Sequence, residues 1–198
     1  MEPQSHIYGW LRGRGWLLLA LLLLGGASGS PLMAQTNLAT ALKPEEVKAL
    51  FLIQFAELTT WPAEDPALTG GKVIIGFVQA SDLLEATKRL LKSGSEERFE
   101  LQVINTLEEA GNCRILYFGE TAGNAGELLH GLHGKPVLTV GEEVTFVRLN
   151  GIIGFTLVPS KGATVTRYFV NVPAMDAAGV RLDTRIIGRA LEWRKERP

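Results

Sequence analysis

The pattern of apolar positions after residue 43 is that of a helix. Apolar side chains recur every three or four positions, at Val47, Phe51, Phe55 and Leu58. This spacing predicts a helix with one buried face, and the apolar residues between these positions indicate that most of its other sides are buried too. Pro44 suits the first helical turn, and the helix should end before the proline that follows Trp61.

Short apolar runs rich in β-branched residues predict the strands. The expected strands are 73–78, 99–104, 114–118, 137–140, 146–148, 152–158 and 164–170. Three further helices are expected. One spans 81–92, a short one begins at a capping pair formed by Asn124 and Glu127, and the last spans 184–195. The inward-facing residues of the last helix should be Ile186, Ile187, Ala190 and Leu191. The last three strands follow one another closely, which favours antiparallel hairpins. The order predicts a single domain of the α/β or α+β class, with a mixed β-sheet covered by helices.

The first 34 residues have the order of a secretion signal. Arg12 and Arg14 form a positive region, an unbroken apolar core follows at 16–24, and small residues lie at 25–30. The core is shorter than the roughly 20 apolar residues that a spanning helix needs. We therefore interpret 1–34 as a signal peptide, with cleavage after Gly29 or Ala34 and an exported domain over 35–198. An uncleaved N-terminal anchor is the alternative, and it also places the domain outside the cytoplasm.

Composition narrows the class of partner and the source of stability. The 198 residues are 46% hydrophobic and 21% charged, with a net charge of −1, which is ordinary for a globular protein. A near-neutral chain disfavours nucleic acid as the main partner, because neutralising phosphates requires a basic surface. Cys113 is the sole cysteine of the sequence, so no disulfide forms within the chain and the core alone must supply stability.

The histidines are weak candidates for a metal site, and the cysteine is a weak candidate for a catalytic nucleophile. His130 and His133 have a spacing found in some zinc sites. Each is followed by a glycine, however, and a solvated helix end is the favoured interpretation. Cys113 precedes an apolar strand, where a buried structural thiol is more usual than a nucleophile.

Two further stretches are candidates for a ligand site or an acid–base pair. Residues 119–123 follow a strand, where open α/β sheets bind ligands, but they lack a nucleotide fingerprint and a plain turn is favoured. Glu142 and Glu143 are interpreted as a solvated loop, because adjacent side chains diverge in direction. The sequence therefore supports no enzyme, and we expect no catalytic residue, no cofactor and no metal.

Several segments together resemble the YfiR-like family of periplasmic proteins. The segments are 48–55 with the Trp61–Pro62 step, the strand 73–78, the cysteine-led strand 113–118, 136–141 followed by 151–155, and 168–171 followed by 178–182 and 185–190. Their order and spacing cover nearly all of the chain after the signal peptide. Two features depart from the family pattern: Cys113 stands alone where members often have further cysteines, and Arg167 with Tyr168 replaces a more acidic, less bulky stretch.

The resemblance implies a periplasmic regulatory binding protein. Its expected action is to repress an inner-membrane diguanylate cyclase by direct contact with the periplasmic part of that enzyme, which lowers cyclic di-GMP and biofilm growth. The alternative is a periplasmic solute-binding or sensor module with a pocket at the strand ends near Gly119. We expect Trp61 and Trp193 to contact the partner, because aromatic anchors dominate interfaces, although both positions also suit the core. A homodimer is left open.

Overall fold

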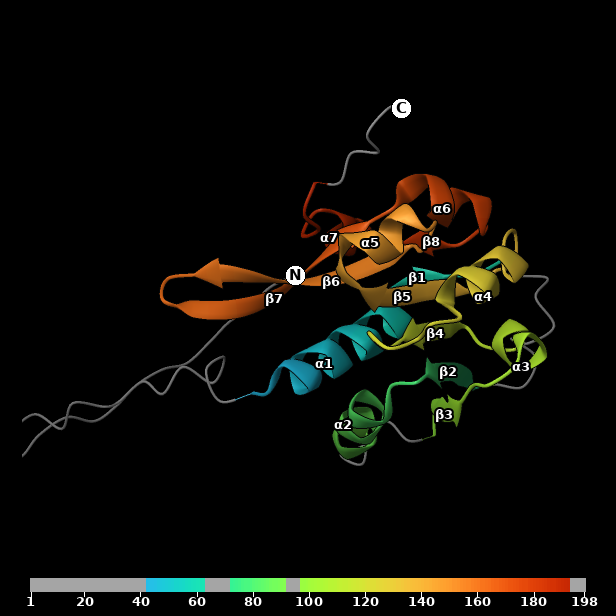
Figure 1. The fold of residues 1–198 in the computed structure, drawn as a ribbon, viewed down its shortest axis with the longest axis horizontal. Helices are drawn as coiled ribbons and strands as arrows, with labels where there is room; N and C mark the ends of the chain where they lie inside the picture. The colour runs from blue at the N-terminus through green and yellow to red at the C-terminus, as the bar shows by residue number, and fades with distance from the viewer. Residues whose placement is uncertain (1–41, 63–71, 92–96, 193–198) are drawn as a thin grey trace, which may run out of the picture. The chain divides into compact units, whose positions relative to one another are not determined.

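The computed structural model describes residues 42–62, 72–91 and 97–192 (Figure 1). Its helices are α1 (Pro44–Glu57), α2 (Ser81–Leu91), α3 (Leu107–Gly111), α4 (Ala125–Gly131), α5 (Glu143–Arg148), α6 (Val172–Ala177) and α7 (Thr184–Ile187). Its strands are β1 (Thr59–Thr60), β2 (Val73–Val78), β3 (Phe99–Val103), β4 (Ile115–Phe118), β5 (Leu138–Glu142), β6 (Ile153–Ser160), β7 (Ala163–Val170) and β8 (Arg181–Leu182). The expected signal peptide, 1–34, lies outside the described residues. Within the described ranges, no helix is long and apolar enough to cross a membrane.

The main sheet has six strands in the order β3-β2-β4-β5-β6-β7. The first five are parallel to their neighbours, and β7 pairs antiparallel with β6. The short strands β1 and β8 form a second, antiparallel sheet. A single α/β domain with a mixed sheet covered by helices is thereby confirmed.

The helices cover both faces of the main sheet, so the apolar core has two halves. One half joins α1, α2 and α6 to alternate sheet residues such as Ile75 and Tyr117. The other joins α3, α4 and α5 to the intervening residues, such as Leu116 and Phe118. Because successive residues of a strand point to opposite faces, strands buried on both faces are continuously apolar, as the run Ile115–Phe118 is.

Helix α1 packs on the sheet through an aromatic cluster. Phe55 is fully buried and lies with its ring centroid 6.0 Å from Phe155 and 5.2 Å from Tyr168. Phe51, one turn earlier, contacts the same two rings. The helical spacing in the sequence is thus confirmed, and the cluster ties α1 to the base of the β6–β7 hairpin.

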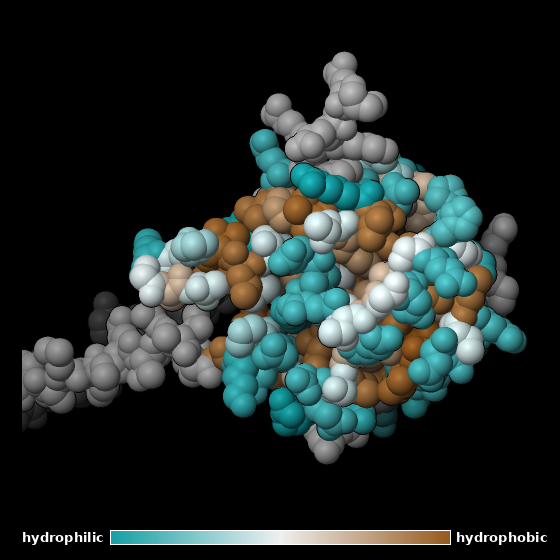
Figure 2. Space-filling model, viewed as in Figure 1, coloured by the Kyte–Doolittle hydropathy of each residue, from teal (hydrophilic) through white to brown (hydrophobic). Residues whose placement is uncertain are grey.

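The β6–β7 hairpin extends beyond the helices that cover the rest of the sheet (Figure 1). Lys161 and Gly162 form its turn, with φ of 47° and 81°, as a two-residue hairpin turn requires. Side chains become more exposed towards this turn: Leu157 is 54% exposed and Val165 is 37% exposed. Apolar surface is visible where the hairpin leaves the rest of the domain (Figure 2).

The strand expected at 146–148 is wrong, because these residues belong to helix α5. The β-branched and aromatic residues of this stretch favour a strand locally. However, β5 and β6 are parallel neighbours, and parallel strands need a crossover connection rather than a tight turn. Helix α5 supplies that crossover and buries Phe146 and Val147. Of the antiparallel hairpins expected among these three segments, the structure therefore contains only β6–β7.

The C-terminal helix expected at 184–195 is wrong in length. Helix α7 ends at Ile187, which is 36% exposed rather than inward, whereas Ile186 is buried as expected. The chain then returns to the sheet, where Leu191 forms a parallel bridge with Phe169 and donates its N–H to the Tyr168 carbonyl. Pairing with the open edge of β7 therefore replaces the last turns of the helix. Helix α4 follows Asn124 as expected, but the Asn124 side chain makes no capping hydrogen bond.

Candidate functional site

The strongest candidate site lies at the carboxyl ends of the neighbouring strands β2 and β4. From β2 the chain crosses to β3 on one side, and it later continues from β4 to β5 on the other side. Open α/β sheets bind ligands at such a switch point, where the loops that follow the two strands diverge. We call the cavity here the strand-end crevice; its volume is about 340 Å³, and its charged and aromatic lining residues are Glu45, Lys48, Asp82, Tyr117, Glu120 and Glu142.

Two loops meet closely at the floor of this crevice. The Gly119 N–H donates to the Val78 carbonyl, so the loop after β4 lies against the end of β2. A Cβ on Gly119 would lie 2.1 Å from the Gln79 carbonyl oxygen, which leaves room only for glycine. Gln79 itself has a φ of 48°, an uncommon conformation that often marks functional sites. The plain turn expected at 119–123 is thus also one wall of a cavity.

A buried polar triad forms the inner wall. The Lys48 ammonium donates to Glu142 Oε1 at 2.6 Å, and these side chains are only 11% and 10% exposed. The Tyr117 hydroxyl donates to the same oxygen. Burial and the nearby Glu142 carboxylate raise the pKa of Tyr117, so the phenol stays protonated and acts as a donor. The three groups hold α1, β4 and the end of β5 together.

The sequence interpretation of Glu142 as a solvated loop residue is therefore wrong. Glu142 ends β5 and points to the face covered by α1, where it joins Lys48 and Tyr117. Glu143 is exposed and begins α5 with a φ of 60°, so the two adjacent carboxylates do diverge. Lys48 and Tyr117 were missed as site residues. The available signal was weak: Tyr117 is the single polar group of an apolar buried strand, and Lys48 is one of several charged residues in α1.

A second cavity of about 360 Å³ adjoins the strand-end crevice and shares part of its wall. Gly119, Glu120 and Glu142 line both cavities, and Leu149, which is 55% exposed, lies on the rim of the second. Together the two cavities follow the carboxyl edge of β2, β4 and β5. The wall between them consists largely of acidic side chains.

A known protein family matches nearly all of the described domain. Residues 45–190 match the model of the YfiR/HmsC-like family. The chain belongs to this family. No curated protein sequence matches it. A crystal structure of a conserved domain protein from Vibrio cholerae O1 biovar El Tor str. N16961 is similar, with a TM-score of 0.53 and 12% sequence identity. The match covers 75% of this chain and 60% of that one, and it shows a shared fold.

Of the two tryptophans expected to contact a partner, this YfiR/HmsC-like structure describes one. Trp61 is half-buried and packs against the core. Its indole Nε1 is buried and has no hydrogen-bond partner among the described residues. Trp193 lies outside the described residues, so partner contact by this pair stays a prediction.

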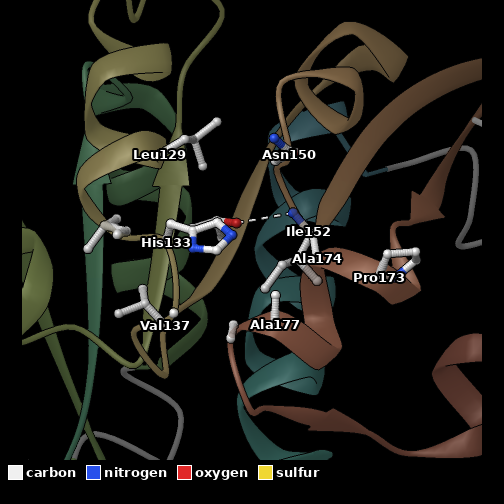
Figure 3. Close-up of a pocket in the computed structure, with 12 residues that line it drawn as sticks. Leu129, His133, Val137, Asn150, Ile152, Pro173, Ala174 and Ala177 are labelled. Carbon is white, nitrogen blue, oxygen red and sulfur yellow. Dashed lines mark hydrogen bonds between the residues drawn. The ribbon is translucent and has the colours of Figure 1, made fainter. Parts of the chain in front are cut away.

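His133 lines a smaller cavity of about 150 Å³ between α4 and α6, next to the chain that enters β6 (Figure 3). There the Thr139 hydroxyl accepts the Ile152 N–H at 3.1 Å, which joins β5 to the chain entering β6. His130 and His133 are both exposed. In the described part of this YfiR/HmsC-like protein, no three His, Cys, Asp or Glu side chains are grouped closely enough to hold a metal ion.

Cys113 is the residue whose reactivity the structure predicts most directly. Its side chain is fully buried in the half of the core next to α3 and α4. Burial, assisted by the charge of Glu109, raises the pKa of the Cys113 thiol to about 12. Thiolates rather than thiols react with electrophiles. Iodoacetamide at pH 8 should therefore leave the folded protein unmodified and alkylate it in denaturant, as intact-mass measurement will show. Rapid alkylation of the folded protein would contradict this burial.

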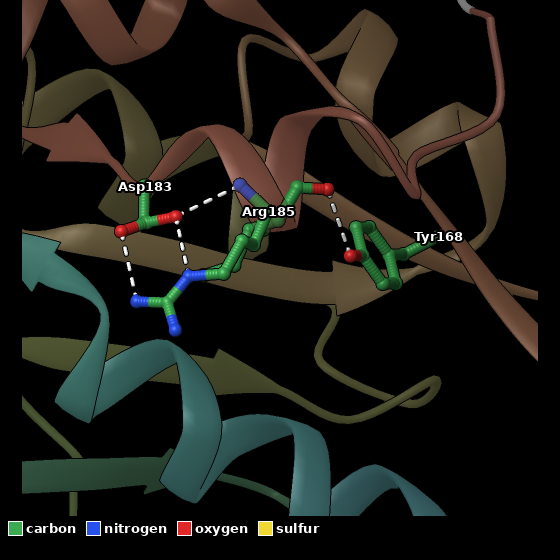
Figure 4. A network of polar contacts seen from close by, with 4 residues as sticks. Tyr168, Asp183 and Arg185 are labelled. Carbon is green, nitrogen blue, oxygen red and sulfur yellow. Dashed lines mark hydrogen bonds and ion pairs between the residues drawn. The ribbon is translucent and has the colours of Figure 1, made fainter.

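Polar contacts hold the C-terminal segment of the YfiR/HmsC-like domain against β7 (Figure 4). The Tyr168 hydroxyl donates to the Ile186 carbonyl at 2.9 Å. Arg185 forms a two-point ion pair with Asp183, and this hydrogen bonding lowers the pKa of Asp183 to about 2. The Asp183 side chain also caps the start of α7. Of these contacts, the Tyr168 hydrogen bond is the one that joins the segment to β7.

Proposed function

We propose that this protein is a periplasmic regulator that represses an inner-membrane diguanylate cyclase by direct contact with the periplasmic part of that enzyme. The observation that carries the proposal is the family match over residues 45–190, which spans nearly all of the described domain. The secretion-signal pattern of 1–34 supports a periplasmic location. Such a regulator acts stoichiometrically, because it lowers activity only by binding the inactive enzyme state more tightly than the active state.

The distal half of the β6–β7 hairpin supports contact with a protein partner. Strand β7 is an edge of the sheet, and Leu191 pairs only with its inner end, at Phe169. Within the described residues, no strand pairs with the outer edge of 163–167. An exposed strand edge is a template for adding a strand from another protein, and the exposed Leu157 and Val165 supply apolar area there.

Deletion of the gene is expected to raise cellular cyclic di-GMP and surface attachment, and a secreted copy should restore the low level. A copy with Leu157→Asp and Val165→Asp should fail to restore it. The register pairs Leu157 with Thr166 and Val158 with Val165, so the two side chains lie on opposite faces of the hairpin, and a partner strand added at the β7 edge would meet a charge on either face. Val103→Asp is the matched control: Val103 is 58% exposed at the opposite edge of the same sheet, and this variant should restore repression.

Two outcomes would decide against parts of this proposal. If deletion leaves cyclic di-GMP unchanged, repression is wrong and the sensor alternative is preferred. If the hairpin variant restores repression, contact lies elsewhere, and Trp61→Ala becomes the next variant to test. Urea unfolding of each purified variant separates lost contact from lost folding.

Export is expected to remove the N-terminal segment by cleavage at a site between Gly29 and Gln35. The positive, apolar and small-residue regions of 1–34 follow the order that signal peptidase substrates share. N-terminal sequencing of protein from the periplasm checks this expectation. Protein that retains Met1 and stays in the cytoplasm would contradict both the export and the proposed location.

A further inference from the structure

The backbone of residues 163–167 leaves one side of β7 open. The Tyr168 carbonyl accepts the Leu191 N–H, so the backbone groups of Tyr168 face the open edge of the sheet. Because the N–H and C=O groups of alternate residues in a strand point to the same side, those of Thr164 and Thr166 face this edge too. No hydrogen bond within the described residues reaches these four groups from the open side. Two donors and two acceptors are therefore available to a neighbouring strand.

The chain itself already pairs with this edge at its inner end. Leu191 forms a parallel bridge with Phe169, which shows that the β7 edge accepts a strand. Since the chain at Leu191 runs parallel to β7, its direction leads away from residues 163–167. Among the described residues, no strand occupies the outer part of the edge.

The charged side chains of the hairpin are all positive. Residues 153–170 include Lys161 and Arg167 and no acidic residue, although the whole chain has a net charge of −1. Arg167 donates from Nη2 to the Arg189 carbonyl at 3.1 Å, so the exposed Arg189 lies next to it in the fold. Neither Lys161 nor Arg167 forms an ion pair within the described part of the chain. An acidic segment would be attracted to these cations, whereas a second copy of β7 would bring further cations and no carboxylate.

The backbone favours a strand over a lipid surface as the occupant. An extended peptide supplies both the acceptors and the donors that Thr164 and Thr166 need. An open strand edge does not occur in the hydrocarbon of a membrane, because no water there can satisfy its backbone groups. Val165 is 37% exposed and lies on the same face of the hairpin as Arg167, so it offers apolar area to a side chain of the added strand.

We propose that residues 163–167 of β7 bind an extended, acidic segment of the periplasmic part of the cyclase as a further strand of the sheet. The backbone of that segment pairs with Thr164 and Thr166, and its carboxylates face Arg167 and Lys161. An apolar side chain between the carboxylates packs on Val165. This surface rests on the proposed function for the identity of its partner, but its chemistry is tested on the purified protein alone.

The test is fluorescence anisotropy of a labelled, amidated peptide, Thr-Glu-Thr-Val-Thr-Glu-Thr, titrated with the protein purified from the periplasm. We expect saturable binding of one peptide per chain that weakens as salt increases. A peptide with lysine in place of both glutamates should not bind. N-methylation of the two threonines beside the valine should also abolish binding, because it removes the donors that pair with the β7 edge.

Two pairs of variants separate the backbone from the charge, with folding checked by urea unfolding. Thr166→Pro removes one outward N–H, as edge strands tolerate, and should weaken binding about tenfold. Thr166→Val keeps the N–H and should bind like the unmodified protein. Lys161→Gln with Arg167→Gln should weaken binding about twofold to fivefold for each cation removed. The control, Lys135→Gln with Arg181→Gln, removes the same charge at exposed positions outside the hairpin and should leave binding unchanged.

Three results would overturn the proposal. The first is the absence of saturable binding of the acidic peptide. The second is equal binding by Thr166→Pro and Thr166→Val, or by the N-methylated and unmethylated peptides, which tests the backbone even if the proline variant does not fold. The third is displacement of the peptide by phosphatidylglycerol vesicles or by dimerisation of the chain, which would assign the edge to a lipid surface or to a second copy.

Failure of this surface and failure of repression give different results. If the peptide does not bind but gene deletion raises cyclic di-GMP, repression stands and the strand site is wrong. If the peptide binds as expected but deletion leaves cyclic di-GMP unchanged, the edge does bind acidic strands and the cyclase is not their source.

Discussion

Phe55→Ala is expected to lower the free energy of unfolding by about 3–5 kcal/mol, the range for removing a large aromatic ring from a core. Phe55 is fully buried, and its ring contacts three others, those of Phe51, Phe155 and Tyr168. The variant loses the transfer free energy of the ring and leaves a cavity that the flanking strands cannot easily fill. Urea unfolding followed by circular dichroism measures the change.

Leu50→Ala is the matched control for the Phe55 variant. Leu50 lies on the same helix but is 45% exposed, so its truncation should cost well under half as much as that of Phe55. If both variants lose similar stability, the loss does not reflect burial of the Phe55 ring; it cannot come from helix propensity, because alanine is the strongest helix former. A loss below about 1 kcal/mol for Phe55→Ala would contradict its place at the centre of the aromatic cluster.

Glu142→Leu is expected to destabilise the domain by about 3 kcal/mol, the lower end of the range for breaking a buried ion pair. It leaves the Lys48 ammonium buried without its partner and removes the acceptor of the Tyr117 hydroxyl. The lower end applies because the strand-end crevice lets water reach the remaining charge. Thermal and urea unfolding at pH 7 measure the loss.

A compensating variant distinguishes the cost of an orphaned charge from the value of the pair. Lys48→Met, Tyr117→Phe and Glu142→Leu together remove every polar group of the triad while keeping similar volumes. Replacing a whole buried polar group by apolar residues is often neutral or stabilising. We therefore expect the triple variant to recover most of the lost stability. If it is no more stable than Glu142→Leu alone, the glutamate itself supports the end of β5 by other contacts.

Helix α1 contacts both the strand-end crevice and the β6–β7 hairpin. Lys48 faces the strand-end crevice, and Phe51 and Phe55 pack on the base of the β6–β7 hairpin. These residues lie within two turns of one helix, so one rigid element borders the strand-end crevice and supports the proposed contact surface. The stability of each α1 variant must therefore be measured before that variant is used to judge binding.

The sequence by itself determined the elements whose signals are local. The spacing of Val47, Phe51 and Phe55, with Pro44 at the start, predicted α1, because a helical period is readable within a few turns. The apolar runs at 73–78 and 114–118 similarly predicted β2 and β4. The segments resembling the YfiR-like family were distributed along the chain, and the family match at 45–190 confirmed that resemblance.

Tertiary structure decided the features that depend on distant partners. The stretch 146–148 is β-prone, yet it is helical because the parallel β5 and β6 require a crossover. The chain after Ile187 leaves the expected helix because the open edge of β7 offers pairing to Leu191. The strand-end crevice depends on an ion pair between Lys48 and Glu142, which are 94 residues apart. No local pattern marks such a pair, because its stability comes from burial and charge that exist only once the helix and the sheet have packed together.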